Sequence, residues 1–251
     1  MASTPAFEPI RIGNTIIKQN KKLLQNTYTI KNDAAPFLMK SIGDKASAPF
    51  EADDVLTLQD YLKRCHHATE LYVALHLVHD LGRQMEALFS EGRGIACIGI
   101  NDVVVITHRS SDAFTHKDAD NSTLGDSRLD PQFLFLNDRM IFEVDESDGS
   151  LLIDRALKDK DTENNEFSFM SPELLEMLKH KAKPPPMHVH FKTAYYSAAQ
   201  LVIYFLLNVK HIPDDDDADL QYMQPIKGTK LYWFLLRCLT PNPADRKYIY
   251  I

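Results

Sequence analysis

The amino-acid sequence predicts an α+β protein in which helices dominate the C-terminal half. Three observations predict this class: short β-prone pieces at the N-terminus, one long amphipathic helix after them, and apolar helical segments in the second half. The 251 residues are 44% hydrophobic and 25% charged. This composition is typical of an ordinary globular protein, with enough apolar residues for one sizeable core or two small ones.

The N-terminal segment, residues 1–55, contains only short β-prone pieces. FEPIRI, NTYTI and PFLMKSI are separated by Asn, Asp, Pro and Lys, and no helix is predicted among them. We therefore expect residues 1–55 to form a short irregular or β-type segment, and residues 56–251 to form the main domain.

Two helices are expected directly after this segment. The first begins at TLQDYL, where Thr57 occupies the N-cap position and Asp60 follows three residues later. In the second, apolar residues recur every three or four positions from Leu71 to Leu88, which predicts a helix of about 20 residues with one buried stripe. Gly92 and Gly94 are expected to end it.

The middle of the chain is predicted to contain strands. DVVVI has the pattern of a buried strand, and MIFEV and SLLID flank the turn-forming DESDG as in a hairpin. Residues 108–131 are polar and rich in Ser and Asp, which predicts a long exposed loop.

The second half is predicted to be helical at SPELLEMLKHK, at Tyr196–Val209 and at Thr229–Leu239. The middle segment is apolar nearly all round, so we expect it to be a buried central helix. In the last segment, the run from Trp233 to Leu236 is interpreted as core.

Charge and cysteine content limit the partners and the compartment. A net charge of -7 argues against non-specific nucleic-acid binding, which usually needs a basic face. The longest apolar stretch, YYSAAQLVIYFLLNV, is shorter than the about 20 residues that a bilayer requires. Three cysteines lie far apart and give no disulfide framework. We therefore expect an intracellular, cytoplasmic protein without a membrane span.

Four segments resemble parts of eukaryotic-type protein kinases. FSFMSPELL is similar to the end of the kinase activation loop, and LTPNPADR is similar to a late C-terminal motif. YYSAAQLVIYFLLN resembles the central kinase helix, and TLQDYL resembles the helix after the hinge. Their order and spacing agree over residues 56–251. The chain thus resembles a degenerate protein-kinase C-terminal lobe, mainly helical, behind a much reduced N-terminal segment.

The resemblance implies one structural ion pair. In kinases the Glu of the activation-loop motif meets the Arg of the late motif, and these positions correspond to Glu173 and Arg246. The guanidinium fork would hold both carboxylate oxygens.

The kinase groups needed for phosphoryl transfer are missing. The first 55 residues offer only Gly13 and Gly43 in place of a Gly-rich loop. Aligning the catalytic loop puts Cys97 at the catalytic base and Asp102 at the metal-binding Asn, and no Asp-Phe-Gly follows. Cysteine cannot replace the carboxylate as proton acceptor. Ala194 replaces the Asp that tethers this loop in kinases, so the resemblance implies a loop that is no longer held for chemistry.

These departures imply a pseudokinase that needs no cofactor and acts by protein–protein binding or scaffolding. A kinase-like lobe behind a short N-terminal segment is an arrangement that makes this chain resemble proteins of large double-stranded DNA viruses. The hypothesis therefore includes a structural or accessory role in a virus particle. Two alternatives stay open. One is an atypical kinase in which Asp102 and an acidic residue of the 112–130 loop bind metal, and the other is a nucleotide-binding pseudoenzyme.

Two charged runs are candidate sites for docking a partner. The first is basic and precedes three prolines, and the second is a run of aspartates. The alternative interpretations are an exposed linker and a solvated acidic loop. The candidate residues are Lys179, Lys181 and Lys183 in the first run, and Asp214, Asp215, Asp216 and Asp217 in the second.

No metal site is predicted. The adjacent side chains of Cys65, His66 and His67 would point about 100° apart on a helix and cannot share one ion. His188 and His190 would lie on one side of a strand, but they lack a third ligand.

Overall fold

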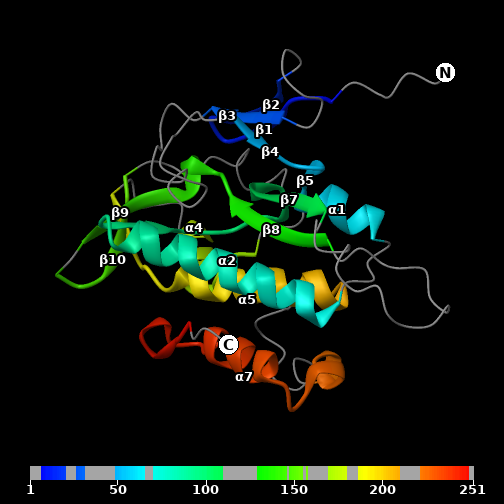
Figure 1. Cartoon of the computed structure of the whole chain (residues 1–251). Coiled ribbons are helices and arrows are strands. Elements are labelled where there is room, and N and C mark those ends of the chain that lie inside the picture. The colour runs from blue at the N-terminus through cyan, green and yellow to red at the C-terminus, as the bar shows by residue number, and fades with distance from the viewer. Residues whose placement is uncertain are drawn as a thin grey trace, which may run out of the picture.

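A computed structural model of the chain describes residues 7–20, 27–31, 49–65, 70–109, 129–145, 147–154, 157, 169–179, 186–209 and 221–248. These residues form eleven strands in three antiparallel sheets, together with five α-helices of seven or more residues. Figure 1 shows the elements in layers, with one sheet at the top, a second sheet below it, and then α2, α5 and α7 in turn.

The N-terminal sheet has the order β1-β2-β3-β4. Its strands are β1 (Ile10–Ile12), β2 (Thr15–Gln19), β3 (Thr27–Lys31) and β4 (Pro49–Glu51). The middle sheet has the order β5-β7-β8, from β5 (Asp54–Thr57), β7 (Val103–Arg109) and β8 (Leu129–Phe135).

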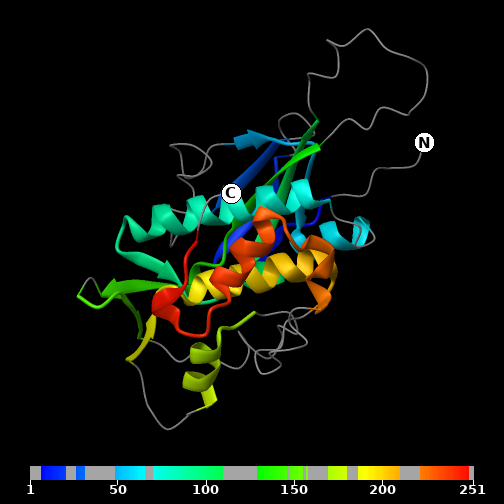
Figure 2. The same cartoon turned by 90° about the horizontal axis from the view of Figure 1, so that it is seen from below.

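The third sheet, called the peripheral sheet, has the order β11-β10-β9-β6. Its strands are β6 (Arg93–Ile95), β9 (Ile141–Asp145), β10 (Ser150–Ile153) and β11 (Met187–His190). The α-helices are α1 (Leu58–Arg64), α2 (Leu71–Phe89), α4 (Pro172–Lys179), α5 (Thr193–Leu207) and α7 (Lys230–Cys238). Figure 2 shows α7 lying over α5, while α4 stands at the edge.

The expectation of a mainly helical kinase-type C-terminal lobe is wrong. The fold is a mixture of α and β in which three antiparallel sheets make up a large part of the described chain. The described part of the N-terminal segment contains the four strands β1 to β4 of one sheet. The strands there are only three to five residues long and are broken by polar residues, so their sequence pattern looked irregular although tertiary pairing makes them regular.

The N-terminal sheet shares one core with the outer face of the middle sheet. Ile17 and Ile30 from the first pack in the same buried cluster as Val104 and Leu134 from the second. Val105, whose side chain points to the other face of β7, belongs to the cluster around α2 and α5. Both faces of β7 are therefore covered, which explains why VVVI lacks any polar alternation.

Helix α5 is the buried central helix that the sequence predicts. Eleven of its residues are buried, and Leu201 is completely shielded from solvent. The helix ends at Asn208, which adopts the left-handed conformation with φ 52°. The predicted N-cap of α1 is also present, because Thr57 Oγ1 accepts a hydrogen bond from the backbone N–H of Asp60 at 3.1 Å.

Helix α2 protects the outer edge of β8. Asp80 Oδ2 accepts a hydrogen bond from the N–H of Phe133 at 2.8 Å, and Gln84 Oε1 accepts one from the N–H of Phe135 at 2.9 Å. The two side chains lie one helical turn apart and meet alternate residues of the strand. Donors that an edge strand would expose are thus satisfied.

Two details of the predicted helical faces differ from the structure. Leu71 was placed in the buried stripe of α2 but is 39% exposed, because the stripe begins one turn later at Ala74. Trp233 was interpreted as core but is 57% exposed, since α7 buries Phe234 and Leu235 instead. No helix in the described part of the chain is long and apolar enough to cross a bilayer.

Candidate functional site

The candidate site is the segment of residues 96–102, which joins β6 to β7. It corresponds in the kinase resemblance to the catalytic loop. Ala96, Ile98 and Ile100 fix it in the protein, because all three are buried. The two residues singled out from the sequence, Cys97 and Asp102, are buried as well.

Cys97 faces the central helix. Its Sγ lies 3.6 Å from Ser197 Oγ on α5. The pKa of the Cys97 thiol is raised to about 12, mainly because burial disfavours the thiolate. At neutral pH the thiol therefore stays protonated.

Ser197 on α5 binds the loop, although Ala194 stands where the kinase resemblance would place the tethering Asp. Ser197 Oγ accepts a hydrogen bond from the N–H of Ile98 at 2.8 Å and lies 3.3 Å from the carbonyl oxygen of Ile98. Ser197, three residues further along α5 than Ala194, thus binds the loop backbone, and the expectation that the loop is no longer held for chemistry stays a prediction. The Ser of YYSAAQ was the sequence signal for this contact.

Asp102 holds the other end of the loop. Its Oδ2 accepts a hydrogen bond from the N–H of Gly99 at 2.6 Å, and its Oδ1 accepts one from Nδ2 of Asn137 at 2.8 Å. Its carbonyl oxygen also accepts the N–H of Leu136 at 2.9 Å. Both carboxylate oxygens are therefore engaged: Oδ2 closes a turn within the loop, and Oδ1 joins the loop to Asn137, which follows β8.

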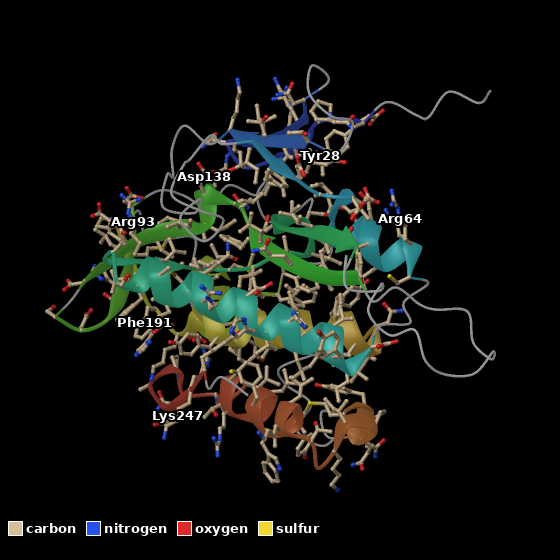
Figure 3. All side chains as sticks on the ribbon, viewed as in Figure 1. Tyr28, Arg64, Arg93, Asp138, Phe191 and Lys247 are labelled. Atoms are coloured by element: carbon tan, nitrogen blue, oxygen red, sulfur yellow. The ribbon has the colours of Figure 1, made fainter. Side chains whose placement is uncertain are left out.

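The tip of the β1–β2 hairpin binds the residues that follow β8. The backbone N–H of Asn14 donates to Asp138 Oδ1 at 2.9 Å, and the Asn14 side-chain amide donates to Oδ2 at 2.8 Å. Thr15 Oγ1 donates to the carbonyl oxygen of Leu136 at 3.0 Å. Gly13 has φ +59°, and a Cβ there would overlap the carboxylate of Asp138. Figure 3 shows Asp138 beside the N-terminal sheet.

The site therefore has two hydrogen-bonded layers. Asn14 lies on the carboxylate of Asp138, and the neighbouring Asn137 binds the carboxylate of Asp102. Sequence reasoning found Asp102 but missed Asn137, which lies 35 positions further along the chain. The only sequence signal was the Gly-Asn pair at the hairpin tip, a combination typical of tight turns.

Glu173 and Arg246 are brought together as the resemblance implied. Arg246 donates from Nη1 to Oε1 at 2.5 Å and from Nη2 to Oε2 at 2.9 Å, so the pair is bidentate. Arg246 is fully buried, whereas the Glu173 side chain is 22% exposed. Arg246 also donates to the carbonyl oxygens of Thr240 and Pro241, at 2.8 and 3.1 Å.

The structure does not place the charged runs that were predicted to dock a partner. Lys179 is the last residue of α4, and Lys181, Lys183 and Asp214–Asp217 lie outside the described residues. Most of the 112–130 loop of the atypical-kinase alternative lies outside them too. Among the residues that are described, no group of three His, Cys, Asp or Glu could hold a metal ion.

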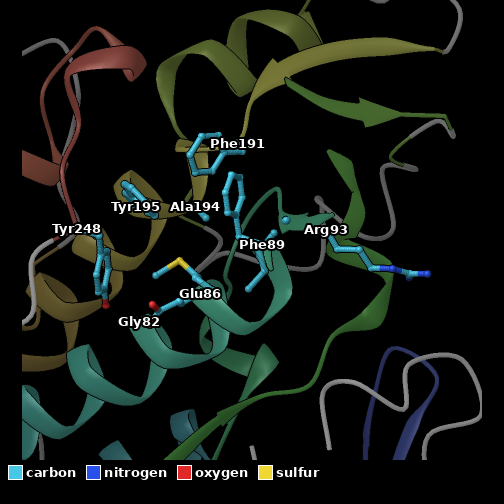
Figure 4. Close-up of a pocket in the computed structure, with 11 residues that line it drawn as sticks. Gly82, Glu86, Phe89, Arg93, Phe191, Ala194, Tyr195 and Tyr248 are labelled. Carbon is cyan, nitrogen blue, oxygen red and sulfur yellow. The ribbon is translucent and has the colours of Figure 1, made fainter. Parts of the chain in front are cut away.

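A second candidate site is an apolar cavity of about 220 Å³ between α2, α5 and the C-terminal residues (Figure 4). The rings of Phe89 and Phe191 stack there with centroids 4.6 Å apart, and Phe89 is 47% exposed. Tyr248 forms part of the opposite wall, where its hydroxyl donates to the carbonyl oxygen of Val78 at 2.6 Å. The full lining is Gly82, Met85, Glu86, Phe89, Arg93, Gly94, Ile95, Phe191, Ala194, Tyr195 and Tyr248.

The cavity is suited to one ring-sized apolar group. Its volume exceeds the roughly 150 Å³ that accommodates benzene in an engineered protein cavity. Burial, aided by the nearby Cys238 and Glu86, raises the pKa of Tyr195, so its phenol stays neutral. No local sequence pattern predicts this cavity, because it forms only where α2, α5 and the C-terminal residues meet in the tertiary fold.

No protein-family model matches the chain, and no curated protein matches it significantly in sequence.

Proposed function

We propose that the chain is a catalytically inactive relative of protein kinases that acts by binding another protein. The observation that carries the proposal is the closed hydrogen-bond network around Asp102. In a phosphoryl-transfer site, carboxylates at such positions must be free to hold metal ions and to accept a proton. Here both oxygens of Asp102 bind protein groups, and the position of the base holds a protonated thiol.

The β1–β2 hairpin further supports the loss of catalysis. A kinase needs a glycine-rich loop that leaves space for phosphates beneath it. In this protein the hairpin tip hydrogen-bonds directly to Asp138 and Leu136. A nucleotide phosphate would have to displace Asn14 from the Asp138 carboxylate and would then meet a like charge.

A binding role is supported by the aromatic cavity. Phe89 exposes almost half of its surface at the cavity wall, and apolar side chains from a partner would bury it. Aromatic residues around a small cavity are typical of sites where a partner inserts one anchoring side chain.

Thermal unfolding with ATP and Mg²⁺ tests the catalytic half of the proposal. A nucleotide at about 100 times its Kd would stabilise the protein by about 2.7 kcal/mol, which corresponds to about 5–11 °C for a chain of this size. We expect no shift, and no transfer from labelled ATP to generic substrates with Mg²⁺ or Mn²⁺.

The matched variant is Asp102→Asn, which keeps the size of the side chain but removes its charge. Transfer by the wild type that disappears in Asp102→Asn would refute the proposal and establish the atypical kinase. A nucleotide-dependent shift without transfer would instead establish the nucleotide-binding pseudoenzyme.

The same proposal includes a structural or accessory role in a particle of a large DNA virus. It rests on the resemblance of the MSPEL and GTKLYWFLLRCL segments to proteins of such viruses. Mass spectrometry of purified particles from infected cells tests it, and absence of the chain from particles that contain other minor components would refute it.

A further inference from the structure

The outer face of α7 carries an unusual combination of side chains. Leu231, Phe234 and Leu235 are buried on its inner side, where α7 packs against α5. Lys230, Trp233 and Arg237 are exposed, and their spacing of three and then four residues places them along one stripe of the helix. We call these three residues the α7 stripe.

Trp233 is 57% exposed and is the only tryptophan of the chain. A single exposed apolar side chain is common on protein surfaces and by itself indicates nothing. Tryptophan and arginine, however, are among the residue types most enriched where a few residues dominate the binding energy of a protein interface. The charges around Trp233 therefore decide its interpretation.

Helix stability accounts for only one of these two charges. Neither Lys230 nor Arg237 forms an ion pair with any described residue. Arg237 lies in the last turn of α7, where a cation is favoured by the helix dipole. Lys230 lies in the first turn, where the dipole disfavours a cation, and no acidic residue of that turn offsets it.

The cations of the α7 stripe belong to the basic end of an acidic protein. Residues 221–248 contain five basic side chains and one acidic side chain, whereas the whole chain has a net charge of -7. One of the five, Arg246, is neutralised by Glu173. Lys247 lies close to the C-terminal end of α7, since its N–H donates to the carbonyl oxygen of Arg237 at 3.3 Å. Figure 3 shows Lys247 at the side of the molecule remote from the N-terminal sheet.

We infer that the α7 stripe binds an acidic segment of a partner protein, with an apolar side chain of that segment packed on the indole of Trp233. Carboxylates would pair with Lys230 and Arg237 on either side of the ring. This inference rests on the proposed function, because it assigns a surface and a partner chemistry to a protein-binding module. A nucleic-acid partner is disfavoured by the net charge of -7.

The single tryptophan makes the test direct, because all indole emission of the full chain comes from Trp233. The probe is a synthetic peptide of Glu and Asp residues with one central Leu, and its control replaces every acid by Gln or Asn. We expect the acidic peptide to shift the emission to shorter wavelength and to bind more weakly as the salt concentration is raised. The neutral peptide should have no effect.

The test variant is Lys230→Glu combined with Arg237→Glu. Its matched control is Lys18→Glu combined with Arg83→Glu, which changes the net charge equally at two exposed positions of β2 and α2. The first should weaken binding by at least about tenfold, a loss typical of removing central interface contacts, and the second should leave it within about twofold. Calorimetry with Trp233→Ala should show a comparable loss without relying on emission.

Four results would overturn the inference. The first is no emission change with the acidic peptide. The second is a shift caused by vesicles of phosphatidylserine but not by the peptide, which would make the stripe a lipid-binding face. The third is a shift that depends only on protein concentration, which would mark a contact between two copies.

The fourth is a shift of Trp233 emission to longer wavelength, in the absence of peptide, when Asp214–Asp217 are changed to Asn. That result would mean that the acidic run of the same chain covers the α7 stripe. Each of these results leaves the ATP experiment unaffected, so failure of the inference and failure of the proposed function are distinguishable.

Discussion

Arg246→Met is expected to lower the free energy of unfolding by about 4 kcal/mol, within the roughly 3–5 kcal/mol typical of breaking a buried ion pair. Arg246 is fully buried and makes four hydrogen bonds of 3.1 Å or less, two to Glu173 and one each to the carbonyl oxygens of Thr240 and Pro241. Methionine fills the space of the aliphatic part but leaves the carboxylate and both carbonyls without a donor. For a chain of this size, 4 kcal/mol corresponds to a decrease in Tm of about 8–16 °C.

The two partners should not be equivalent. Glu173→Gln is expected to lower the free energy of unfolding by only about 2–3 kcal/mol, because Arg246 keeps two carbonyl acceptors and the ring of Tyr196, whose centroid is 4.8 Å from Cζ. In the double variant, methionine removes the guanidinium that Gln cannot neutralise. The loss should therefore be smaller than the sum of the two single losses by at least about 1 kcal/mol.

Urea denaturation followed by circular dichroism measures all three variants on one scale. Arg246→Lys is the charge-preserving control, and it should also destabilise the protein, because an ammonium cannot reach the carboxylate and the two carbonyls as the planar fork does. A loss below about 1 kcal/mol for Arg246→Met, or additive losses in the double variant, would contradict the reasoning, since both require the pair to be buried and coupled.

Three further predictions concern the hairpin, the core and the thiols. Gly13→Ala should destabilise the protein by more than Gly92→Ala, which is expected to cost about 1 kcal/mol. Both glycines have positive φ, but only at Gly13 would a Cβ overlap a carboxylate. Equal losses in urea denaturation would refute the close approach of Gly13 to Asp138. Leu201→Asp should prevent soluble folding, because an unpaired charge would be buried in α5, and soluble protein with the wild-type Tm would contradict this. The free energy of unfolding should fall as the pH rises from about 9 towards 12. Burial raises the pKa of Cys97 to about 12, so the unfolded chain loses its thiol proton at a lower pH than the folded chain does. Cys238, whose pKa burial also raises, contributes to the same decrease, and an unchanged pH dependence in Cys97→Ala would contradict the assignment to Cys97.

The sequence allowed the two long helices and the ion pair to be predicted. The apolar stripe of α2 and the all-round apolar pattern of α5 arise from local periodicity, so a single segment carries the information. The contact between Glu173 and Arg246 spans 73 positions, and only the kinase resemblance made it predictable.

The sheets could not be predicted to the same extent. Strands such as β1 and β4 have three residues each, so their sequences contain too few alternations to show a pattern. Their pairing depends on contacts between distant segments, as in the packing of Ile17 near Leu134. The candidate site has the same difficulty, because Asp102 was found from a motif whereas Asn14 and Asp138 meet only through the tertiary fold.

The contacts of Asp80 and Gln84 with β8 restrict how this protein can take part in assemblies. An open sheet edge is a template on which a foreign strand can pair, both in regulated strand addition and in fibril growth. Asp80 and Gln84, one turn apart on α2, accept the N–H groups of Phe133 and Phe135, which are two residues apart on β8. The helix therefore occupies the hydrogen-bonding positions that an added strand would need. A partner therefore cannot extend the middle sheet at β8 without first removing a helix of 19 residues that is packed into the core. A strand from another protein would therefore have to pair at a different sheet edge.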